Sequence, residues 1–240
     1  MRTQILGVGF DGLTISEAKS AFLGLLKTDE PSLVVTPNPE MVMLARKDTK
    51  FKDLLNSADL VVPDGIGIVH ASKLTKKPLK QRVAGFDLLL EVFAAKEAKE
   101  VKWYFLGGKP GVAEKAKKQM EQRFGLQVAG CENGYFKDDD AVIARIAASG
   151  ADIVLVGLGF PRQEIWAATN KHKLGAKILM GVGGSFDVMS GELKRAPKFF
   201  QKIGLEWLYR LLRQPKRIWR QRVLLKFAIV VIFRKMRGAM

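Results

Sequence analysis

The sequence predicts an α/β fold: a mostly parallel, Rossmann-like sheet with helices on both faces, followed by a basic, amphipathic helical C-terminal appendage. Short β-rich runs alternate with longer helical patterns, which is typical of a parallel sheet covered by helices. Charge is uneven, since 14 of the 40 Lys and Arg residues and one of the 24 acids fall in residues 194–240. The 240 residues can bury a substantial core. We therefore expect an α/β domain over residues 1–195 and the appendage over residues 196–240.

Seven β-rich runs define the expected strands. In chain order they are Gln4–Val8, Leu33–Thr36, Leu60–Val62, Trp103–Leu106, Gln127–Ala129, Ile153–Val156 and Lys177–Met180. Longer helical patterns lie between them. The clearest are Ser16–Lys27, Gly85–Lys96, Gly111–Phe124, Asp138–Ala148 and Arg162–Lys173. In such a sheet, ligands bind in the crevice beyond the carboxyl ends of the strands, so a site is expected where the strands end.

Glycine and hydrogen-bonding side chains gather where five of these strands end. The segments concerned are residues 36–40, 63–67, 107–108, 157–164 and 181–187. Glycine lets backbone N–H groups approach a phosphate or a base closely, and a helix N-terminus beyond it adds partial positive charge. Each segment is a weak signal by itself, because Gly and Asp also form turns and helix caps. Together they indicate a nucleotide site.

A formal G-x-G-x-x-G run, from Gly7 to Gly12, follows the first strand. In a dinucleotide-dependent enzyme this loop opens directly into a helix, and an acid at the end of the second strand binds the ribose. Here the second strand ends in Thr36 rather than in an acid. Asp11 and Thr14 have the character of turn and N-cap residues. The sequence therefore disfavours a nicotinamide-dependent oxidoreductase, which stays open as an alternative.

Asp64 is the strongest candidate for a general base. It stands between Pro63 and Gly65 at a strand end, where a carboxylate can be partly desolvated. An N-cap for the helix that begins at Gly65 is an equally supported role. His70 and His172 are the only histidines, so the sequence gives little support for a His-based catalytic triad or a His-rich metal site.

Disulfide and metal chemistry also have little support in the sequence. Cys131 is the only cysteine, which excludes an intrachain disulfide and a thiolate cluster. Asp138, Asp139 and Asp140 stand in series at the start of a helical pattern, where acids favour the helix dipole, so capping is their expected role. We expect neither metal ligands nor a cofactor.

The appendage has the pattern of a helix that binds an anionic surface. Trp207, Tyr209 and Trp219 are interleaved with its bases, and an apolar run of about 11 residues ends at Phe233, interrupted only by Lys226. This pattern suits a membrane, where bases meet lipid phosphates and apolar side chains enter the acyl boundary. Nucleic acid is a less favoured partner, because a phosphate backbone leaves the apolar run unexplained. Packing of the apolar face on the domain is the third interpretation.

The apolar run is too short to span a bilayer. Crossing the hydrocarbon takes about 20 residues, so the appendage is expected to lie on the membrane. The N-terminus reaches Asp11 and Glu17 without a long apolar stretch, so no signal peptide is expected. These features predict a peripheral protein on the cytoplasmic face of the plasma membrane. An undocked appendage would leave apolar surface that could join copies of the chain into a homo-oligomer.

Six segments of the sequence form a recognisable pattern: residues 36–40 (TPNPE), 63–67 (PDGIG), 82–87 (RVAGFD), 157–164 (GLGFPRQE), 181–187 (GVGGSFD) and 195–197 (RAP). In order and spacing, they resemble those of the bacterial WecG/TagA/CpsF glycosyltransferases. The resemblance covers essentially the whole chain. Residues 204–210 and the basic tail look like the TagA branch, which makes the linkage unit of wall teichoic acid.

This resemblance implies a metal-independent, inverting transfer. N-acetylmannosamine would pass from UDP-N-acetylmannosamine to the 4-hydroxyl of N-acetylglucosamine on undecaprenyl diphosphate, forming a β-1,4 bond. Related transferases that use another UDP-sugar, such as UDP-N-acetylmannosaminuronate, share these motifs. Outside the family, the alternatives are the oxidoreductase and a non-catalytic basic module that binds lipid or nucleic acid.

The resemblance also implies roles for individual residues. Asp64 matches the proposed base, and the other positions that match pocket residues implicated in activity are Thr36, Asn38, Arg82 and Gln163. By the same resemblance, the appendage would supply arginines matching Arg210, Arg217 and Arg220, although Pro215 is expected to bend or break their helix. The residues expected to bind the nucleotide are Gly107, Tyr135, Gly159, Gln163, Gly183, Gly184 and Asp187. Among these, Tyr135 would stack on uracil, and Asp187 would read the uracil edge.

Overall fold

The computed structural model describes residues 2–197, 199–200, 206–213 and 218–236. Within these residues, six parallel strands form the main sheet in the spatial order β4-β3-β8-β7-β5-β6. They are β3 (Ser32–Val35), β4 (Leu60–Val61), β5 (Lys102–Gly107), β6 (Gln127–Glu132), β7 (Ile153–Gly157) and β8 (Ile178–Gly181). The predicted parallel sheet is confirmed, and each of these strands overlaps a run that the sequence assigns to it.

The helices follow the predicted alternation. They are α1 (Ile15–Gly24), α2 (Pro39–Ala45), α3 (Thr49–Ser57), α4 (Ile66–Ser72), α5 (Gly85–Phe93), α6 (Glu97–Glu100), α7 (Val112–Phe124), α8 (Asp139–Ser149), α9 (Arg162–Asn170), α10 (Ser185–Met189), α12 (Glu206–Arg213) and α13 (Ile218–Met236). Short 3-10 turns, η1 (Leu25–Lys27) and η2 (Lys171–Lys173), extend α1 and α9. The helices predicted from the clearest patterns are all present, with ends that differ by a few residues.

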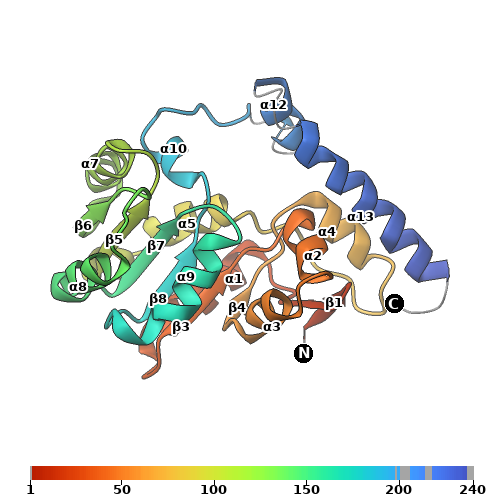
Figure 1. Ribbon diagram of the computed structural model, residues 1–240, viewed down its shortest axis with the longest axis horizontal. Helices are drawn as coiled ribbons and strands as arrows, with labels where there is room; N and C mark the ends of the chain where they lie inside the picture. Colours follow the sequence, from red (N-terminus) through yellow and green to blue (C-terminus); the bar gives the residue numbers. More distant parts are fainter. Residues whose placement is uncertain (1, 198, 201–205, 214–217, 237–240) are drawn as a thin grey trace.

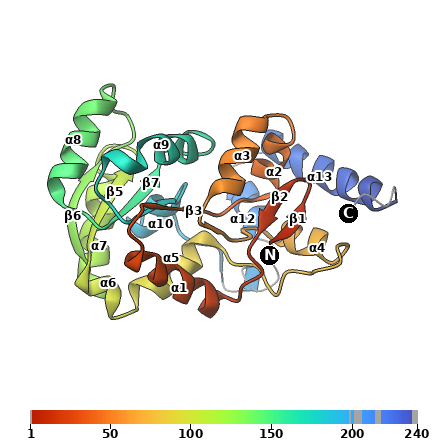
Figure 2. The ribbon, with the colours of Figure 1, turned by 90° about the horizontal axis from the view of Figure 1, so that it is seen from below.

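Side chains alternate between the two faces of the sheet and build two cores. Along β7, Val154 and Val156 enter one core, while Ile153 and Leu155 enter the other. Residues of α2, α3, α8 and α9 complete the first core, and residues of α1, α5, α7 and α10 complete the second. Figure 2 shows α8 and α9 on one side of the strands and α1 and α5 on the other. Burial on both faces explains why the strands are continuous apolar runs in the sequence.

The prediction for the first strand, Gln4–Val8, is wrong. Residues 4–8 do not form one strand of the main sheet, because β1 (Thr3–Ile5) and β2 (Val8–Phe10) pair as a separate antiparallel hairpin. Leu6 and Gly7 form its turn with φ values of 51° and 89°, in the left-handed region that a hairpin turn requires. The G-x-G-x-x-G run therefore lies in a hairpin and does not open into a helix.

Asp11 joins this hairpin to the main sheet. Its carboxylate accepts hydrogen bonds from Nε of Arg2 at 3.0 Å and from the backbone N–H of Val61 at 2.9 Å. Thr14 then caps α1, and Glu17 completes a capping box by accepting from the Thr14 N–H. The turn and N-cap roles predicted for Asp11 and Thr14 are confirmed.

Helix α13 packs along α2 and α4 and forms one end of the molecule (Figure 1). Phe227 and Val231 are each 3% exposed and join the first core, whereas Leu225, Ile229 and Phe233 are more than half exposed. The helix thus has an inward and an outward apolar face, and packing on the domain accounts only for the inward one. Among the described residues, no helix is long and apolar enough to cross a bilayer. Division of the chain after residue 195 stays a prediction.

Candidate active site

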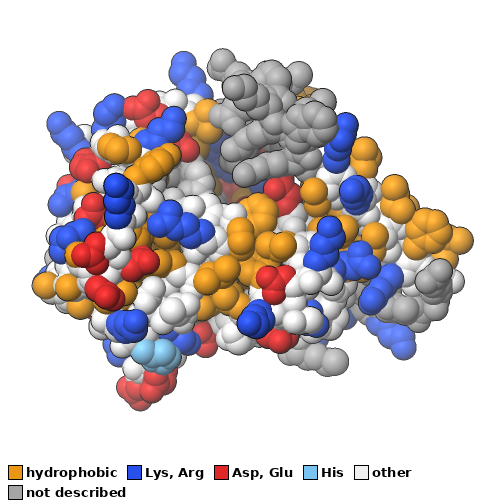
Figure 3. Space-filling view, in the orientation of Figure 1, with side chains coloured by type: hydrophobic (Ala, Val, Ile, Leu, Met, Phe, Trp, Pro, Cys, Tyr) orange, Lys and Arg blue, Asp and Glu red, His pale blue; other side chains and the backbone are white. Residues whose placement is uncertain are grey.

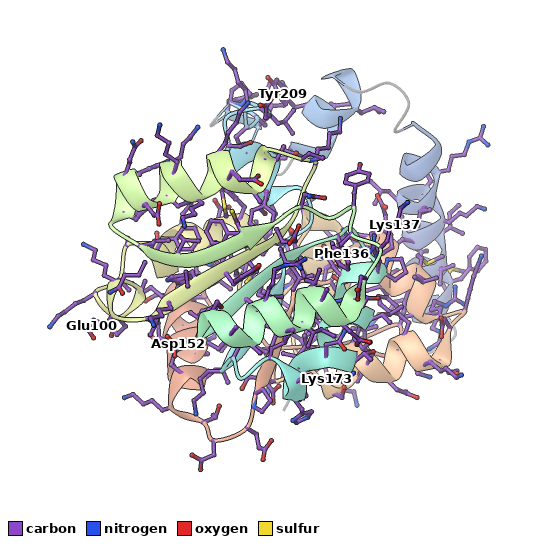
Figure 4. All side chains as sticks on the ribbon, turned by 60° about the vertical axis from the view of Figure 1, so that its left-hand side comes forward. Glu100, Phe136, Lys137, Asp152, Lys173 and Tyr209 are labelled. Carbon is purple, nitrogen blue, oxygen red and sulfur yellow. The ribbon has the colours of Figure 1, made fainter. Side chains whose placement is uncertain are left out.

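Two adjoining cavities lie at the carboxyl edge of the sheet. The glycine cavity, of about 590 Å³, is lined by loops after β5, β6, β7 and β8. The carboxylate cavity, of about 770 Å³, is lined by loops after β3, β4, β7 and β8 and by α13. Gly159, Gly183 and Gly184 line both, so the cavities share a wall. In Figure 4, Phe136, which follows β6, lies near this edge, whereas Asp152, which precedes β7, lies toward the opposite edge, where the strands begin.

The glycine cavity combines an aromatic ring with two basic side chains. Tyr135, which is 67% exposed, lines it together with Lys109, Arg162 and Asp187. The guanidinium of Arg162 stacks over the ring of Phe136 at 5.1 Å and donates to a backbone carbonyl of the loop after β6 at 3.2 Å. These contacts hold a positive charge beside the cavity. The sequence indicated Tyr135 and Asp187 but not the two bases, although Arg162 stands inside the 157–164 segment.

Gly107 has a packing role, and its binding role stays a prediction. It does not line either cavity, and a Cβ atom there would overlap the carbonyl oxygen of Gly157 on the neighbouring strand. Glycine at this position therefore lets β5 and β7 pair closely. Its neighbour Gly108 lines the glycine cavity.

Gln163 holds together the loops that follow β7 and β8. Its Oε1 accepts hydrogen bonds from the N–H groups of Gly159 at 3.2 Å and Gly183 at 2.9 Å. Its Nε2 donates to Oε1 of Glu164 at 2.7 Å. In this structure the two glycine N–H groups therefore hold the loops together, and contact of Gly159 and Gly183 with a nucleotide stays a prediction. Gln163 also lines the carboxylate cavity while being only 5% exposed.

Glu164, which accepts the hydrogen bond from Gln163, is a buried acid. It is 2% exposed, and its Oε2 has no hydrogen-bond partner among the described residues. Burial raises the pKa of Glu164 to about 7, and the hydrogen bond from Gln163 offsets this only in part. The carboxyl group is therefore partly protonated near neutral pH.

We expect the Glu164→Gln variant to be less sensitive to pH than the parent protein. Between about pH 4.5 and 7, the unfolded chain has released this proton while the folded chain retains it, so a rise in pH favours unfolding. The free energy of unfolding of the parent should fall relative to the variant by up to about 3 kcal/mol across this window. Urea denaturation at both ends of the window measures the difference. Parallel pH dependence of the two proteins would refute it.

The loops after β3 and β4 bring Thr36, Asn38 and Asp64 into the carboxylate cavity. Asn38 also caps α2, since its Oδ1 accepts from the N–H of Met41 at 3.1 Å. Thr36 packs against Gly85, where a Cβ atom would lie 3.1 Å from the threonine side chain. Local structure therefore fixes both polar side chains beside Asp64.

The capping role considered for Asp64 is wrong. The N-cap of α4 is Gly65, whose φ of 122° favours glycine, and this helix has no side-chain cap. The side chain of Asp64 is 34% exposed, and its Oδ1 lies 3.5 Å from Nη2 of Arg82. Asp64 thus places a partly exposed carboxylate in the cavity beside a fixed cation, which suits a group that accepts a proton from a ligand.

Arg82 and Arg195 form an ion network with three carboxylates. Nη2 of Arg82 lies 2.5 Å from Oε2 of Glu206, closer than it lies to Asp64. Arg195 contacts Glu206 at 3.2 Å and Asp87 at 2.6 Å. Since Glu206 begins α12, this network connects the α/β domain to the appendage. Residues 82 and 206 are 124 positions apart, so no local pattern could indicate their contact.

Glu206 remains ionised although it is 7% exposed. Burial by itself raises the pKa of its carboxyl group, but the hydrogen bond and charge of Arg82, with the charge of Arg195, outweigh burial and lower it. Burial similarly opposes the charge of Arg82, yet the carboxylates of Asp64 and Glu206 raise the pKa of its guanidinium. Both ends of this contact are therefore charged at neutral pH.

Some predicted residues cannot be placed in the site. Pro215 and Arg217 lie outside the described residues, and so do the side chains of Arg210 and Arg220 in α12 and α13. The described parts of these helices end at Arg213 and resume at Ile218.

The three acids Asp138, Asp139 and Asp140 lie at the start of α8. Asp138 is the N-cap, with Oδ1 accepting from the N–H of Ala141 at 2.9 Å, and Asp139 accepts from Nε1 of Trp166 at 2.8 Å. The capping role predicted at this position is confirmed for Asp138.

Comparison with known proteins identifies the family. Residues 3–239 match the model of the glycosyl transferase WecG/TagA/CpsF family. The chain belongs to this family. Two relatives carry the name N-acetylglucosaminyldiphosphoundecaprenol N-acetyl-beta-D-mannosaminyltransferase. The Bacillus spizizenii protein is 41% identical over 197 residues, which cover 82% of this chain and 76% of that one. The Staphylococcus aureus (strain MRSA252) protein is 36% identical over 224 residues, covering 91% and 87%.

Membership of the WecG/TagA/CpsF family confirms the resemblance drawn from the six sequence segments. In this chain, residues of those segments line the two cavities, and Asp64 and Arg82 come from the 63–67 and 82–87 segments. The family's motifs thus meet at one edge of the sheet.

Proposed function

We propose that this WecG/TagA/CpsF family member transfers N-acetylmannosamine from UDP-N-acetylmannosamine to N-acetylglucosamine on undecaprenyl diphosphate, in the synthesis of the wall teichoic acid linkage unit. The name shared by relatives that align over most of the chain supports this activity. The observation that carries it is the wall shared by two cavities of different chemistry. A donor in one and an acceptor in the other would meet at the shared glycines.

The donor nucleotide fits the glycine cavity. The exposed ring of Tyr135 offers a stacking surface for uracil, and Lys109 and Arg162 offer positive charge for the diphosphate. Asp187 lines the same cavity and supplies a hydrogen-bond acceptor for a base edge. Arginines of the appendage would add further charge during release of UDP.

The acceptor fits the carboxylate cavity, which is polar on one side and apolar on the other. Asp64 and Arg82 line its polar part, whereas Met41, Phe227 and Val231 come from helices that wall the apolar part. A sugar diphosphate attached to an isoprenoid chain has the same division between a polar and an apolar end. Its orientation would bring the sugar to Asp64.

The reaction then needs one base. The 4-hydroxyl oxygen of the acceptor sugar attacks the anomeric carbon from the face opposite UDP, and a new carbon–oxygen bond forms as the bond to the diphosphate breaks. The carboxylate of Asp64 takes the hydroxyl proton, and the electron pair of the broken bond leaves with UDP. Because attack and departure take place on opposite faces, the configuration at the anomeric carbon inverts.

The outward face of α13 would hold the protein at a membrane surface. Leu225, Ile229, Phe233 and Met236 recur at helical spacing along this face and are 53–76% exposed. By the same spacing, Arg222 lies beside them. Figure 3 shows hydrophobic side chains next to Lys and Arg at this end of the molecule. An apolar stripe bordered by bases enters the boundary of anionic lipid, where the lipid-linked acceptor resides.

We expect Tyr135→Ala to raise the dissociation constant for UDP about tenfold, because stacking on one base contributes about 1–3 kcal/mol. Tyr135→Phe keeps the ring and should bind nearly as well as the parent. Isothermal titration calorimetry with UDP measures both. Equal affinity of the alanine variant and the parent would place uracil elsewhere.

A panel of donors tests the proposed function. The enzyme is incubated with a lipid-diphosphate-linked N-acetylglucosamine and, in turn, with UDP-N-acetylmannosamine, UDP-N-acetylmannosaminuronate and UDP-N-acetylglucosamine. We expect a disaccharide-lipid product, detected by mass spectrometry, chiefly from UDP-N-acetylmannosamine. A product only from the uronate would reassign the donor, and no product from any donor would refute the transferase.

A further inference from the structure

Glu206 has no part in the reaction as described, yet only Arg82 separates its carboxylate from that of the base, Asp64. Its carboxylate binds Nη2 of Arg82, the same nitrogen that faces Asp64. The distances are 2.5 Å to Glu206 and 3.5 Å to Asp64. The first is a charge-assisted hydrogen bond, and the second is an ion pair that is too long for one. Two carboxylates thus compete for one guanidinium nitrogen, and Glu206 holds it.

The position of this nitrogen matters for a base. A carboxylate that accepts a direct hydrogen bond from arginine is stabilised in its charged form and becomes a weaker proton acceptor. A guanidinium kept slightly farther away still orients the carboxylate and offsets nearby charge. We propose that Glu206 is a positioning residue for catalysis: by binding Arg82 it keeps the guanidinium off Asp64, and so preserves the ability of Asp64 to take the acceptor proton.

The surrounding charges are consistent with this role. Arg195 contacts Glu206 from the other side, and Asp87 anchors Arg195. Glu206 is therefore held from two directions and cannot follow Arg82 toward Asp64. The charged and titratable groups that line the cavity or join this network among the described residues are Glu40 of α2, Asp64, His70 of α4, Arg82, Asp87 of α5, Arg195 and Glu206 of α12.

Glu206 belongs to α12, whereas Arg82 and Asp64 belong to the α/β domain. Removing the carboxylate of Glu206 takes away the nearest partner of Arg82 and leaves Asp64 as the remaining carboxylate that faces Nη2, which weakens the base. The inference rests on the proposed function, because it assigns Glu206 an effect on the base of that reaction.

The test is the pH dependence of turnover in Glu206→Gln, measured on a soluble acceptor analogue that needs no membrane. We expect kcat at neutral pH to fall by a factor of up to about ten with little change in KM, and the acidic limb of the kcat profile to move down by about one pH unit. Glu206→Asp keeps the charge at shorter reach and should move the limb less. Glu192→Gln removes an exposed carboxylate paired with Lys115 at 2.6 Å and should leave the profile unchanged.

Other outcomes overturn the proposal. An unmoved acidic limb in Glu206→Gln, with lower thermal stability or weaker vesicle binding, would make Glu206 only an anchor for the appendage. Tighter UDP binding with faster turnover would mean that Glu206 occupies a site for substrate phosphate. If the Gln variant does not fold, Glu206→Asp decides alone, and an unmoved limb in it refutes the proposal. Absence of transfer by the parent enzyme would overturn the proposed function together with this inference, whereas transfer with an unmoved limb would overturn the inference alone.

Discussion

Asp64→Asn should lower turnover by about 100-fold or more while UDP binding is retained. The amide keeps the shape of the carboxylate but cannot accept the proton of the acceptor hydroxyl. Because the N-cap of α4 is Gly65, the substitution removes no helix cap, and the fold should be preserved. Asp64 lines the carboxylate cavity and not the glycine cavity, so the affinity for UDP should change little.

Turnover with saturating substrates, UDP affinity and the thermal unfolding temperature together decide this prediction. Thr36→Val is a matched control in the same cavity, since it removes a hydroxyl and leaves the carboxylate in place. We expect a smaller loss from it than from Asp64→Asn. Near-normal turnover of Asp64→Asn, in a folded protein that binds UDP, would remove Asp64 from the role of base.

The second large effect concerns the outward face of α13. Replacing Leu225, Ile229 and Phe233 together with Gln should weaken binding to anionic vesicles by at least about 100-fold, because burial of one such side chain contributes about 1.5–3 kcal/mol. These residues point away from Phe227 and Val231, so the inward packing should survive. Turnover on a soluble acceptor should therefore stay near that of the parent. Vesicle sedimentation and the soluble assay give the two readouts.

Variants of the appendage arginines distinguish a role in membrane docking from a role in catalysis. If they meet the diphosphate, Arg217→Ala and Arg220→Ala should lower turnover on the soluble acceptor while vesicle binding falls only slightly. Arg222→Ala, in the helix that also holds Arg220, is the matched control and should leave soluble turnover unchanged. Full soluble activity of the first two variants would confine these arginines to lipid contact. Undiminished vesicle binding by the triple Gln variant would refute docking through α13.

The main sheet was predictable because its strands are buried on both faces. Runs such as Ile153–Val156 and Leu33–Thr36 contain almost no polar residues, and helices must cover both sides of such strands. The N-terminal hairpin was not predictable in the same way. Its two strands have three residues each, and the Leu6–Gly7 turn lies inside what the pattern presents as one apolar run.

The site was predictable where it depends on strand ends. Thr36, Asn38 and Asp64 follow adjacent strands of a parallel sheet, so topology brings them together once the strands are known. Pairings across long sequence distances were not predictable from composition or spacing. The contact of Arg82 with Glu206 depends on how the appendage folds back, and the use of glycine N–H groups by Gln163 depends on the geometry of two loops.

The configuration of the product tests the central account most directly. The enzyme is incubated with UDP-N-acetylmannosamine and a soluble, diphosphate-linked N-acetylglucosamine, and the one-bond carbon–proton coupling at the new anomeric centre is measured by NMR. A single displacement assisted by Asp64 predicts a β-1,4-linked disaccharide, inverted relative to an α-linked donor. An α-linked product would require two displacements or front-face attack, and would contradict the proposed mechanism.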